Sequence, residues 1–373
     1  MSAARARGAI LASLLLFALS LGACAMLGDE TRFPFRVTTS GVGPFRQLES
    51  YETGVTLAPK GQAVASRSVA MQSGMVAEGQ LFFAAAPMLM DAPPRDESLA
   101  EWEIDPLQIE PLRLMRARAI EQTGTLGGRT VPLRGFQEPT LLLEASEAWE
   151  GSELFDPHLV ILDDGRARLY YAAAGGIGVA EASSAEGAFS RIGSEPILDQ
   201  AQGAGPESPR SPSLLRMSDG RWWMYYDAGD GIRLASSEDG LRFAPIDGDE
   251  TTAELDPLRL EAPAESLERG LGMPSALVAE TPSGRRLIRL YFEVRLDEGP
   301  LVSMAASEDG VHFERYEGAS FAIDAPGAPR VQLLEGGQTL LLASQARAQL
   351  GIQLRALVFA VTPSAHLFAD EPE

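Results

Sequence analysis

Apolar residues along this chain gather in short runs that polar turn residues separate. Three runs are rich in aromatic side chains, and they cover residues 168–171, 222–226 and 289–292. Short runs of β-branched and aromatic residues between turn signals are typical of β-strands. No long stretch after Leu27 keeps the 3.6-residue apolar period of a helix. The pattern therefore predicts an all-β protein.

The aromatic runs belong to a longer repeat. Each follows a Gly turn, and that turn follows an X-Pro step at Asp156-Pro157, Ser211-Pro212 or Met273-Pro274. A second Gly turn comes after each run, within residues 183–189, 236–243 and 306–313. Asp-Gly pairs favour hairpin turns because those turns need positive φ. Four short strands repeating at this interval are typical of a propeller blade.

Two further blades complete the count. A fourth copy of the repeat starts at Ala328-Pro329 but lacks a last strand, and residues 40–46 resemble that missing strand. Residues 66–136 provide the remaining blade, interrupted by a Pro-rich acidic insertion at 87–111. Closure removes unpaired sheet edges. We therefore expect a five-bladed β-propeller over residues 40–365 whose last blade is closed by an N-terminal strand; a pair of β-sandwiches is the alternative.

The N-terminus has the features of an export signal. Arg5 and Arg7 precede an uncharged, strongly apolar segment, and residues 21–24 read Leu-Gly-Ala-Cys. This segment is short for a membrane span, and its end resembles a bacterial lipobox. The resemblance implies a signal peptide at 1–23 and a diacylglycerol group on Cys24. The bounds of the predicted propeller then leave a tether at 24–39 and a C-terminal tail at 366–373. Because the residue after Cys24 is not Asp, we expect the outer membrane of the cell envelope; a signal peptide with an incidental cysteine is the alternative.

Charge and composition exclude several classes of function. The chain has 31 Lys and Arg against 52 Asp and Glu, which gives a net charge of −21. Nucleic-acid binding depends on clustered cations, so we expect no nucleic-acid partner. One cysteine and three histidines do not supply a structural zinc site. We expect no metal and no cofactor.

The second blade carries a resemblance to a known superfamily. Trp149-Glu150-Gly151, Asp156-Pro157, an Asp-Asp-Gly turn and a Leu-Tyr-Tyr strand follow one another. This order resembles the five-bladed β-propeller glycosidases, which include arabinanases, β-xylosidases, invertases, levansucrases and related phosphorylases. The resemblance implies an axial funnel with three carboxylates: a base or nucleophile, a general acid, and a third group that orients them. Cleavage needs two carboxyl groups about 5 Å apart for retention and about 6.5–9.5 Å apart for inversion.

Few carboxylates of this chain match that requirement. Asp156 matches the superfamily's Asp-Pro pattern as the orienting group, although an Asp in a turn also caps backbone N–H groups. The equivalent positions in the following blades hold Ser211, Met273 and Ala328. Glu207 is the second catalytic candidate, with a solvated loop acid as the alternative.

Arg210, Glu268 and Trp149 are the candidates for ligand binding. A guanidinium that faces the funnel can hold sugar hydroxyls or a carboxylate, and Trp149 lies outside the regular strands. His158 is expected to be a hydrogen-bonded core residue, and most aromatic strand residues are expected to fill the core.

Three functions remain open. The first is a membrane-anchored propeller that binds carbohydrate without catalysis. The second is an active glycoside hydrolase or phosphorylase that uses Asp156 with a nearby Glu. The third is a protein-binding scaffold of an envelope complex.

The lipid anchor gives the first testable prediction. Replacing Cys24→Ser removes the thiol that would be acylated, so the protein should move from the membrane fraction to the soluble fraction on ultracentrifugation. A Cys24→Ser protein that still sediments with membranes would refute the anchor.

Overall fold

The computed structural model describes much of the predicted propeller. The described residues are 35–37, 46–47, 69–87, 111–126, 129–136, 139–248, 254–260, 267–280, 286–297, 299–315, 326–333, 339–349, 352–361 and 368–370. Cys24, the signal peptide and nearly all of the 87–111 insertion lie outside them, so these features stay predictions. Within the described residues, no helix has the length and apolar character needed to cross a membrane.

Three blades are four-stranded antiparallel meanders in chain order. The second blade contains β8 (Leu154–Ile161), β9 (Ala167–Ala173), β10 (Gly176–Ala182) and β11 (Ser190–Arg191). The third contains β12 (Arg210–Arg216), β13 (Trp222–Asp227), β14 (Ile232–Ser237) and β15 (Ala244–Ile246). The fourth contains β16 (Gly270–Glu280), β17 (Arg286–Arg295), β18 (Leu301–Ser307) and β19 (Glu314–Arg315).

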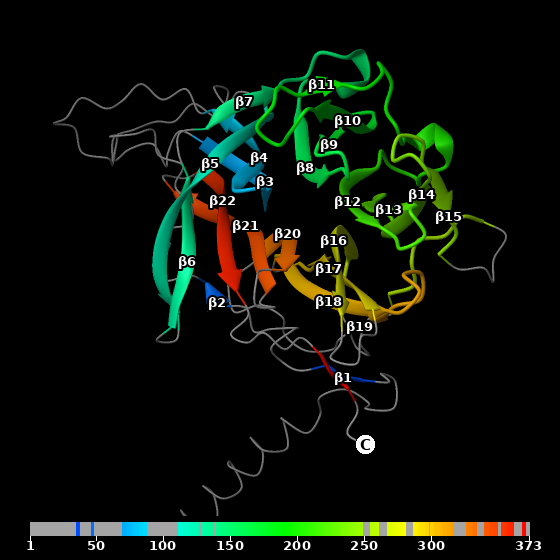
Figure 1. The fold of residues 1–373 in the computed structure, drawn as a ribbon. Coiled ribbons are helices and arrows are strands. Elements are labelled where there is room, and N and C mark those ends of the chain that lie inside the picture. Colours follow the sequence, from blue (N-terminus) through cyan, green and yellow to red (C-terminus); the bar gives the residue numbers. More distant parts are fainter. Residues whose placement is uncertain are drawn as a thin grey trace, which may run out of the picture.

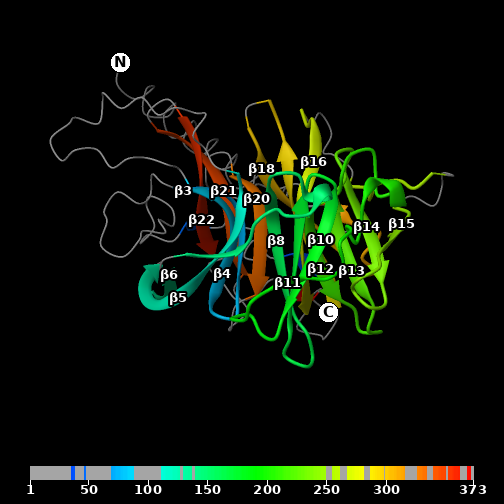
Figure 2. The same cartoon turned by 90° about the horizontal axis from the view of Figure 1, so that it is seen from above.

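The first blade carries an extra hairpin. Its strands are β3 (Val69–Ala77), β4 (Gln80–Pro87), β5 (Arg113–Leu126), β6 (Arg129–Phe136) and β7 (Thr140–Leu143). The first part of β5 pairs with both β4 and β7, whereas its second part pairs with β6. The β5–β6 hairpin therefore extends away from the blade (Figure 2), and the blade ends at Leu143 rather than at the predicted residue 136.

An N-terminal strand completes the last blade, as predicted. That blade contains β20 (Pro326–Leu333), β21 (Thr339–Gln349), β22 (Ile352–Val361) and β2 (Arg46–Gln47), and β2 pairs with β22. Each inner strand contacts the inner strands of both neighbouring blades, and β20 contacts β3, so the five blades form a ring around one axis (Figure 1). This ring confirms the predicted β-propeller. The predicted tether and tail also meet, because β1 (Phe35–Val37) pairs with β23 (Phe368–Asp370).

The X-Pro steps form β-bulges within the inner strands. At Asp156-Pro157 two residues of β8 oppose one residue of β9, and the same register shift recurs in the next three blades. Each inner strand begins one to three residues before its X-Pro step, not at the step as predicted. Proline is tolerated here because the bulge lies on an edge strand, where its missing N–H removes no ladder hydrogen bond.

The residue before each of these prolines has a positive φ. The φ angles are 52° at Asp156, 53° at Ser211, 49° at Met273 and 46° at Ala328. Such a conformation in a non-glycine residue costs about 1–3 kcal/mol and often marks a reactive site. Here it recurs in four blades, even where the side chain is only a methyl group. The strain therefore belongs to the architecture of the inner strand and does not by itself indicate chemistry.

Side chains of one blade accept hydrogen bonds from edge-strand backbone N–H groups of the next blade. The Leu214 N–H donates to His158 Nε2 at 3.3 Å, the Ala276 N–H to Ser213 Oγ at 2.8 Å and the Val331 N–H to Ser275 Oγ at 3.0 Å, with a similar contact from the Leu159 N–H to Met75 Sδ. The inner strand is an edge strand, and an unpaired buried N–H group is costly. These contacts join the five inner strands at four of the junctions between blades.

The repeated Gly turns form a second joint between blades. The hydroxyl of Tyr170 donates to the carbonyl of Gly240 at 2.9 Å, and Tyr225 makes the same bond to Gly310 at 2.8 Å. The aromatic strand residues that carry these contacts are buried, as predicted, and they fill the space between neighbouring sheets. The Gly turns of the third and fourth blades are thus each fixed by a tyrosine of the preceding blade.

This joint predicts an asymmetry between two glycines of equal backbone conformation. Gly310 has φ of 80°, and an added Cβ would lie 2.3 Å from the Trp223 ring, whereas Gly165 has φ of 85° and open space around it. Urea unfolding of the detergent-solubilised full chain should show that Gly310→Ala destabilises more than Gly165→Ala by about 1–3 kcal/mol, the usual cost of overpacking. Equal losses in the two variants would show that the turn is not packed against the preceding blade.

Candidate functional site

Four consecutive blades carry a bulge residue at the equivalent place of the inner strand, and we call these four residues the axial ring: Asp156, Ser211, Met273 and Ala328. The hydroxyl of Ser211 donates to Asp156 Oδ2 at 2.6 Å, and the Met273 sulfur contacts the same hydroxyl. Asp156 is only 1% exposed, and Ser211 and Ala328 are also buried. The axial position predicted for Asp156 is therefore found, but solvent does not reach its carboxylate.

Arg330 and His158 lie further along the inner strands. Each is held by a hydrogen bond to the backbone of a neighbouring inner strand. Arg330 is buried and donates from Nη1 to the carbonyl of Pro274 at 2.7 Å. Burial lowers the pKa of Arg330, and the negative charge of Asp156 opposes that shift. Burial and the positive charge of Arg330 lower the pKa of His158 to about 3. His158 is therefore a neutral hydrogen-bonded core residue, as predicted, and not a catalytic base at neutral pH.

A charged network lies at one end of the propeller, where inner strands begin and second strands end; we call this end the mouth. Its centre is Asp227, the last residue of β13, which is 0% exposed. Asp227 accepts a hydrogen bond from the Gly229 N–H at 2.9 Å and another from Arg295 Nη2. Arg210 Nε lies 3.8 Å from the same carboxylate. One buried anion therefore holds two guanidiniums that come from neighbouring blades.

The network continues to the fifth blade. Arg295 Nε lies 3.5 Å from Glu293 Oε1, and the other oxygen of Glu293 accepts a hydrogen bond from the Ala328 N–H at 2.9 Å. A Cβ on Gly272 would lie 2.2 Å from Arg295 Nη2, so a glycine is required for the guanidinium to reach Asp227. Three blades are thus linked through one arginine.

Glu207 and Arg210 form the exposed part of the network, as the sequence placed them near one another. Glu207 Oε2 lies 3.1 Å from Arg210 Nη2, and the side chains are 60% and 36% exposed. Arg295 is 31% exposed. The mouth therefore presents to solvent two partly exposed guanidiniums and the carboxylate that pairs with one of them, beside the buried carboxylate of Asp227. The two predicted catalytic carboxylates lie in different surroundings, because Asp156 is buried and accepts a hydrogen bond from Ser211, whereas Glu207 is exposed and pairs with Arg210.

Glu268 and Trp149, the other predicted ligand-binding residues, are engaged by side chains of the propeller itself. Both oxygens of Glu268 accept hydrogen bonds from Arg315, whose guanidinium also lies over the Phe292 ring at 5.2 Å. Trp149 lies in a short 3-10 helix, η5 (Ala148–Glu150), and its half-buried ring stacks on Tyr171 with centroids 6.1 Å apart. One side of the Trp149 ring packs against the core shared by the first and second blades, and the residue keeps intermediate exposure.

Sequence reasoning did not find Asp227, Arg295 or Glu293. A usable signal exists, since Asp227 and Arg295 are the final residues of the second strands of neighbouring blades and so lie on the same face. Glu150 was also missed. It is fully buried and accepts hydrogen bonds from Tyr171 and Arg191 at 2.7 Å each. Although burial alone would raise the pKa of Glu150, Arg191 and two backbone N–H groups hold it below its ordinary value.

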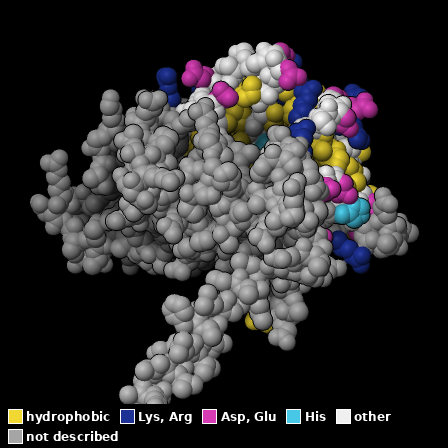
Figure 3. Space-filling model, turned by 60° about the horizontal axis from the view of Figure 1, so that its bottom comes forward, with side chains coloured by type: hydrophobic (Ala, Val, Ile, Leu, Met, Phe, Trp, Pro, Cys, Tyr) yellow, Lys and Arg dark blue, Asp and Glu magenta, His cyan; other side chains and the backbone are white. Residues whose placement is uncertain are grey.

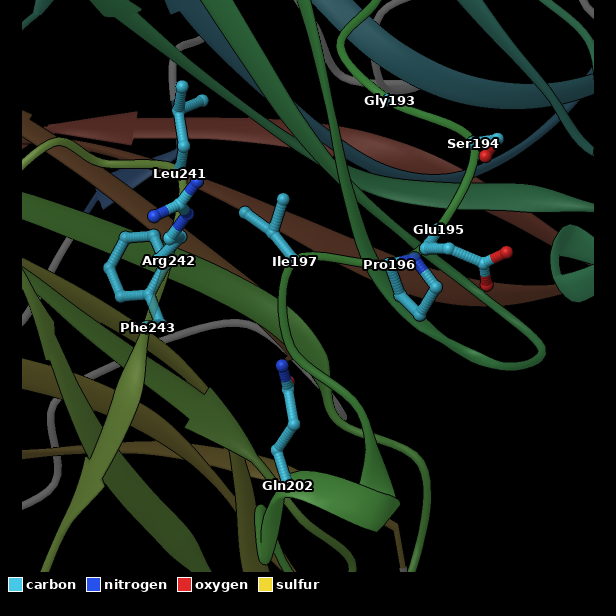
Figure 4. Close-up of a pocket in the computed structure, with 9 residues that line it drawn as sticks. All are labelled: Gly193, Ser194, Glu195, Pro196, Ile197, Gln202, Leu241, Arg242 and Phe243. Carbon is cyan, nitrogen blue, oxygen red and sulfur yellow. The ribbon is translucent and has the colours of Figure 1, made fainter.

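A separate groove lies at the rim, between the outer parts of the second and third blades (Figure 4). Its volume is about 440 Å³, and its apolar lining includes Ile197, Leu241 and Phe243. Gln202, from the 3-10 helix η6 (Gln200–Gln202), and Arg242 add polar groups, whereas Glu195 points away from the other labelled side chains. This lining suits an apolar contact better than acid–base chemistry.

The described part of the surface carries many charged side chains, but they form no metal-ligand cluster. On the face shown in Figure 3, acidic and basic side chains of the described residues are interspersed around hydrophobic ones. Among the described residues, no cluster of three or more His, Cys, Asp or Glu side chains is arranged to hold a metal ion.

Three solved structures share the fold, and all are linked by name to glycoside chemistry. An endo-1,4-β-xylanase from Bacteroides thetaiotaomicron has a TM-score of 0.51 at 14% identity and covers 81% of this chain and 97% of its own. A candidate glycoside hydrolase from Bacteroides ovatus has a TM-score of 0.54 at 15% identity, with coverages of 88% and 99%.

The third structure comes from the GH130 family of mannoside phosphorylases, which contains glycoside hydrolases that target β-1,2-mannosidic linkages in Candida mannan; its TM-score is 0.53 at 11% identity, with coverages of 89% and 97%. No family model and no curated protein matches the chain. The comparisons confirm the glycosidase-type propeller fold and, at these identities, the fold alone.

The neutral axial histidine predicts a pH dependence of stability. An unfolded chain binds a proton at His158 below about pH 6.5, whereas the folded chain binds it only near pH 3, so protonation favours unfolding as the pH falls between those values. The free energy of unfolding should therefore decrease less steeply between about pH 7 and about pH 4 in His158→Gln than in the parent protein. Identical slopes in urea titrations would contradict the buried, neutral imidazole.

Proposed function

We propose that this protein is a lipid-anchored protein of the bacterial envelope whose propeller mouth binds a saccharide without cleaving it. The observation that supports the proposal most directly is the pair of partly exposed guanidiniums, Arg210 and Arg295, held at the mouth by the buried carboxylate of Asp227. A side chain that is fixed by a buried partner loses little conformational freedom when a ligand binds, which favours affinity.

The chemistry of the mouth suits sugar hydroxyls, because each hydroxyl both donates and accepts hydrogen bonds. Arg210 and Arg295 offer donors, and Glu207 offers an exposed acceptor beside them. The structures that share this fold carry names tied to xylan and to β-1,2-mannosidic linkages. These names support a saccharide as the ligand class.

The axial ring supports binding over cleavage. Glycoside hydrolysis requires two carboxyl groups on either side of the scissile bond. Among the four ring positions only Asp156 carries a carboxylate, and it is buried and accepts a hydrogen bond from Ser211. At the mouth, Asp227 and Glu293 are engaged by Arg295 and by backbone N–H groups, and Glu207 is paired with Arg210. We therefore assign Asp156 a positioning role in the ring.

The sequence supports the anchor. Acylation of Cys24 would attach several hydrocarbon chains, and each buried CH₂ contributes about 0.8 kcal/mol to membrane binding. A tether of some fifteen residues, 24–39, would then hold the propeller close to the outer membrane.

A protein-binding scaffold is the second candidate, and the groove at the rim favours it. Leu241 lines this groove beside Ile197 and Phe243, which belong to the core between the second and third blades. An apolar depression of this kind can receive an apolar side chain of a protein partner. The two candidates use different surfaces, so they can be tested separately.

The test measures binding and cleavage on the same sample. The detergent-solubilised full chain should be retained by at least one polysaccharide in a panel of immobilised glycans and should release no chromophore from chromogenic glycosides. Asp227→Asn should lower that binding about tenfold or more, because two guanidiniums lose their buried counter-charge. Asp219→Asn, which removes an exposed acid at the opposite end of β13, is the matched control.

Two outcomes would contradict the proposal. Glycoside cleavage that disappears in Asp156→Asn would establish the hydrolase or phosphorylase interpretation. A folded protein that binds no glycan, confirmed by an unchanged unfolding curve, would leave the scaffold.

A further inference from the structure

The two guanidiniums of the mouth have more donors than their protein partners use. A guanidinium has five N–H donors in a fixed fork. Arg210 gives one hydrogen bond to Glu207, and its Nε, which is buried, has no hydrogen-bond acceptor among the described residues. Arg295 shares its donors between Asp227 and Glu293 and is still 31% exposed. The donors that face solvent at the mouth therefore lie on the partly exposed ends of the two guanidiniums, and the buried Arg210 Nε is not among them.

Glu207 occupies the position that a ligand's carboxylate would take. It lies on a loop between Gly203 and Pro209, and its carboxyl carbon would be 2.4 Å from a Cβ on Gly229, so it packs directly over that glycine. Its carboxylate pairs with Arg210, and the side chain is 60% exposed. An exposed ion pair of this kind contributes about 0–1 kcal/mol, so replacing it with another carboxylate costs little.

We propose that the mouth recognises an acidic saccharide, and that the ligand's carboxylate displaces Glu207 from Arg210 and binds to Arg210 and Arg295. The inference rests on the proposed saccharide-binding function and adds the chemical class of the ligand. A planar carboxylate matches the guanidinium fork in a bidentate arrangement, which is stronger than a bond to a neutral hydroxyl.

The overall negative charge of the chain does not prevent this binding. The net charge is −21, but interactions between exposed charges are screened beyond about 8 Å at physiological ionic strength. Within that range the ligand meets the guanidiniums of Arg210 and Arg295. When Glu207 is displaced, the nearest exposed carboxylate also moves away from the ligand. Binding should therefore be specific to carboxylates at short range and should weaken as salt is added.

The experiment compares ligands that differ only in charge. Immobilised polygalacturonate, alginate, hyaluronan and glucuronoxylan are each paired with a carboxyl-reduced form, and the detergent-solubilised full chain is titrated onto every pair. We expect at least one acidic form to bind about tenfold or more tightly than its reduced form, as a charge-assisted bond predicts. Inorganic phosphate is added as a competitor in a separate arm.

Two variants of opposite effect identify the residues. Arg210→Gln should weaken binding of the acidic form about tenfold, whereas Glu207→Gln should strengthen it because the internal competitor loses its charge. The matched controls are Arg221→Gln and Glu238→Gln, which make the same charge changes at the other end of the third blade. If Glu207 only stabilised the loop, Glu207→Gln would weaken binding. If Glu207 were catalytic, Glu207→Gln would leave the preference for the acidic form over the reduced form unchanged.

The outcomes separate the two levels of the proposal. Equal binding of acidic and reduced forms would overturn the acidic-ligand inference and leave saccharide binding intact. No binding of any form by a folded protein would overturn both. Displacement of the acidic saccharide by phosphate at equal concentration would show a small-oxyanion site and overturn the assignment of a carboxylate ligand, as would weaker binding in Glu207→Gln.

Discussion

The structure depends on how five inner strands satisfy their unpaired edges around one axis. Four of the inner strands have a β-bulge at an X-Pro step, and side chains such as His158, Ser213 and Ser275 accept hydrogen bonds from backbone N–H groups of the next blade. Buried N–H groups without acceptors would each cost free energy. Closing the ring in this way fills the axis with Asp156 and its neighbours, and the accessible polar chemistry is left at the mouth.

The mouth is organised by charge rather than by shape. The fully buried Asp227 fixes Arg210 and Arg295, and Gly272 provides the space for this contact. Breaking a buried ion pair by removing one partner is far more costly than losing an exposed pair. The buried carboxylate therefore orients the exposed guanidiniums, and the proposed saccharide-binding function rests on this arrangement.

Local signals predicted the blades well, because X-Pro steps, Gly turns and aromatic runs each specify a backbone conformation or a buried face. They placed β9, β13 and β17, and they anticipated that β2 would complete the last blade. The site was less predictable, since Asp227 and Arg295 lie 68 residues apart and meet only through the register of two blades. The packing of Trp149 likewise depends on Tyr171, and no pattern in the sequence shows that contact.

A crystal structure of the complex with the tightest-binding oligosaccharide would test the central claim most directly. The account predicts electron density for a sugar over Arg210 and Arg295, with the hydrogen bond between Ser211 and Asp156 intact beneath it. A sugar ring in contact with the carboxylate of Asp156, or one seated in the groove beside Ile197, would contradict it.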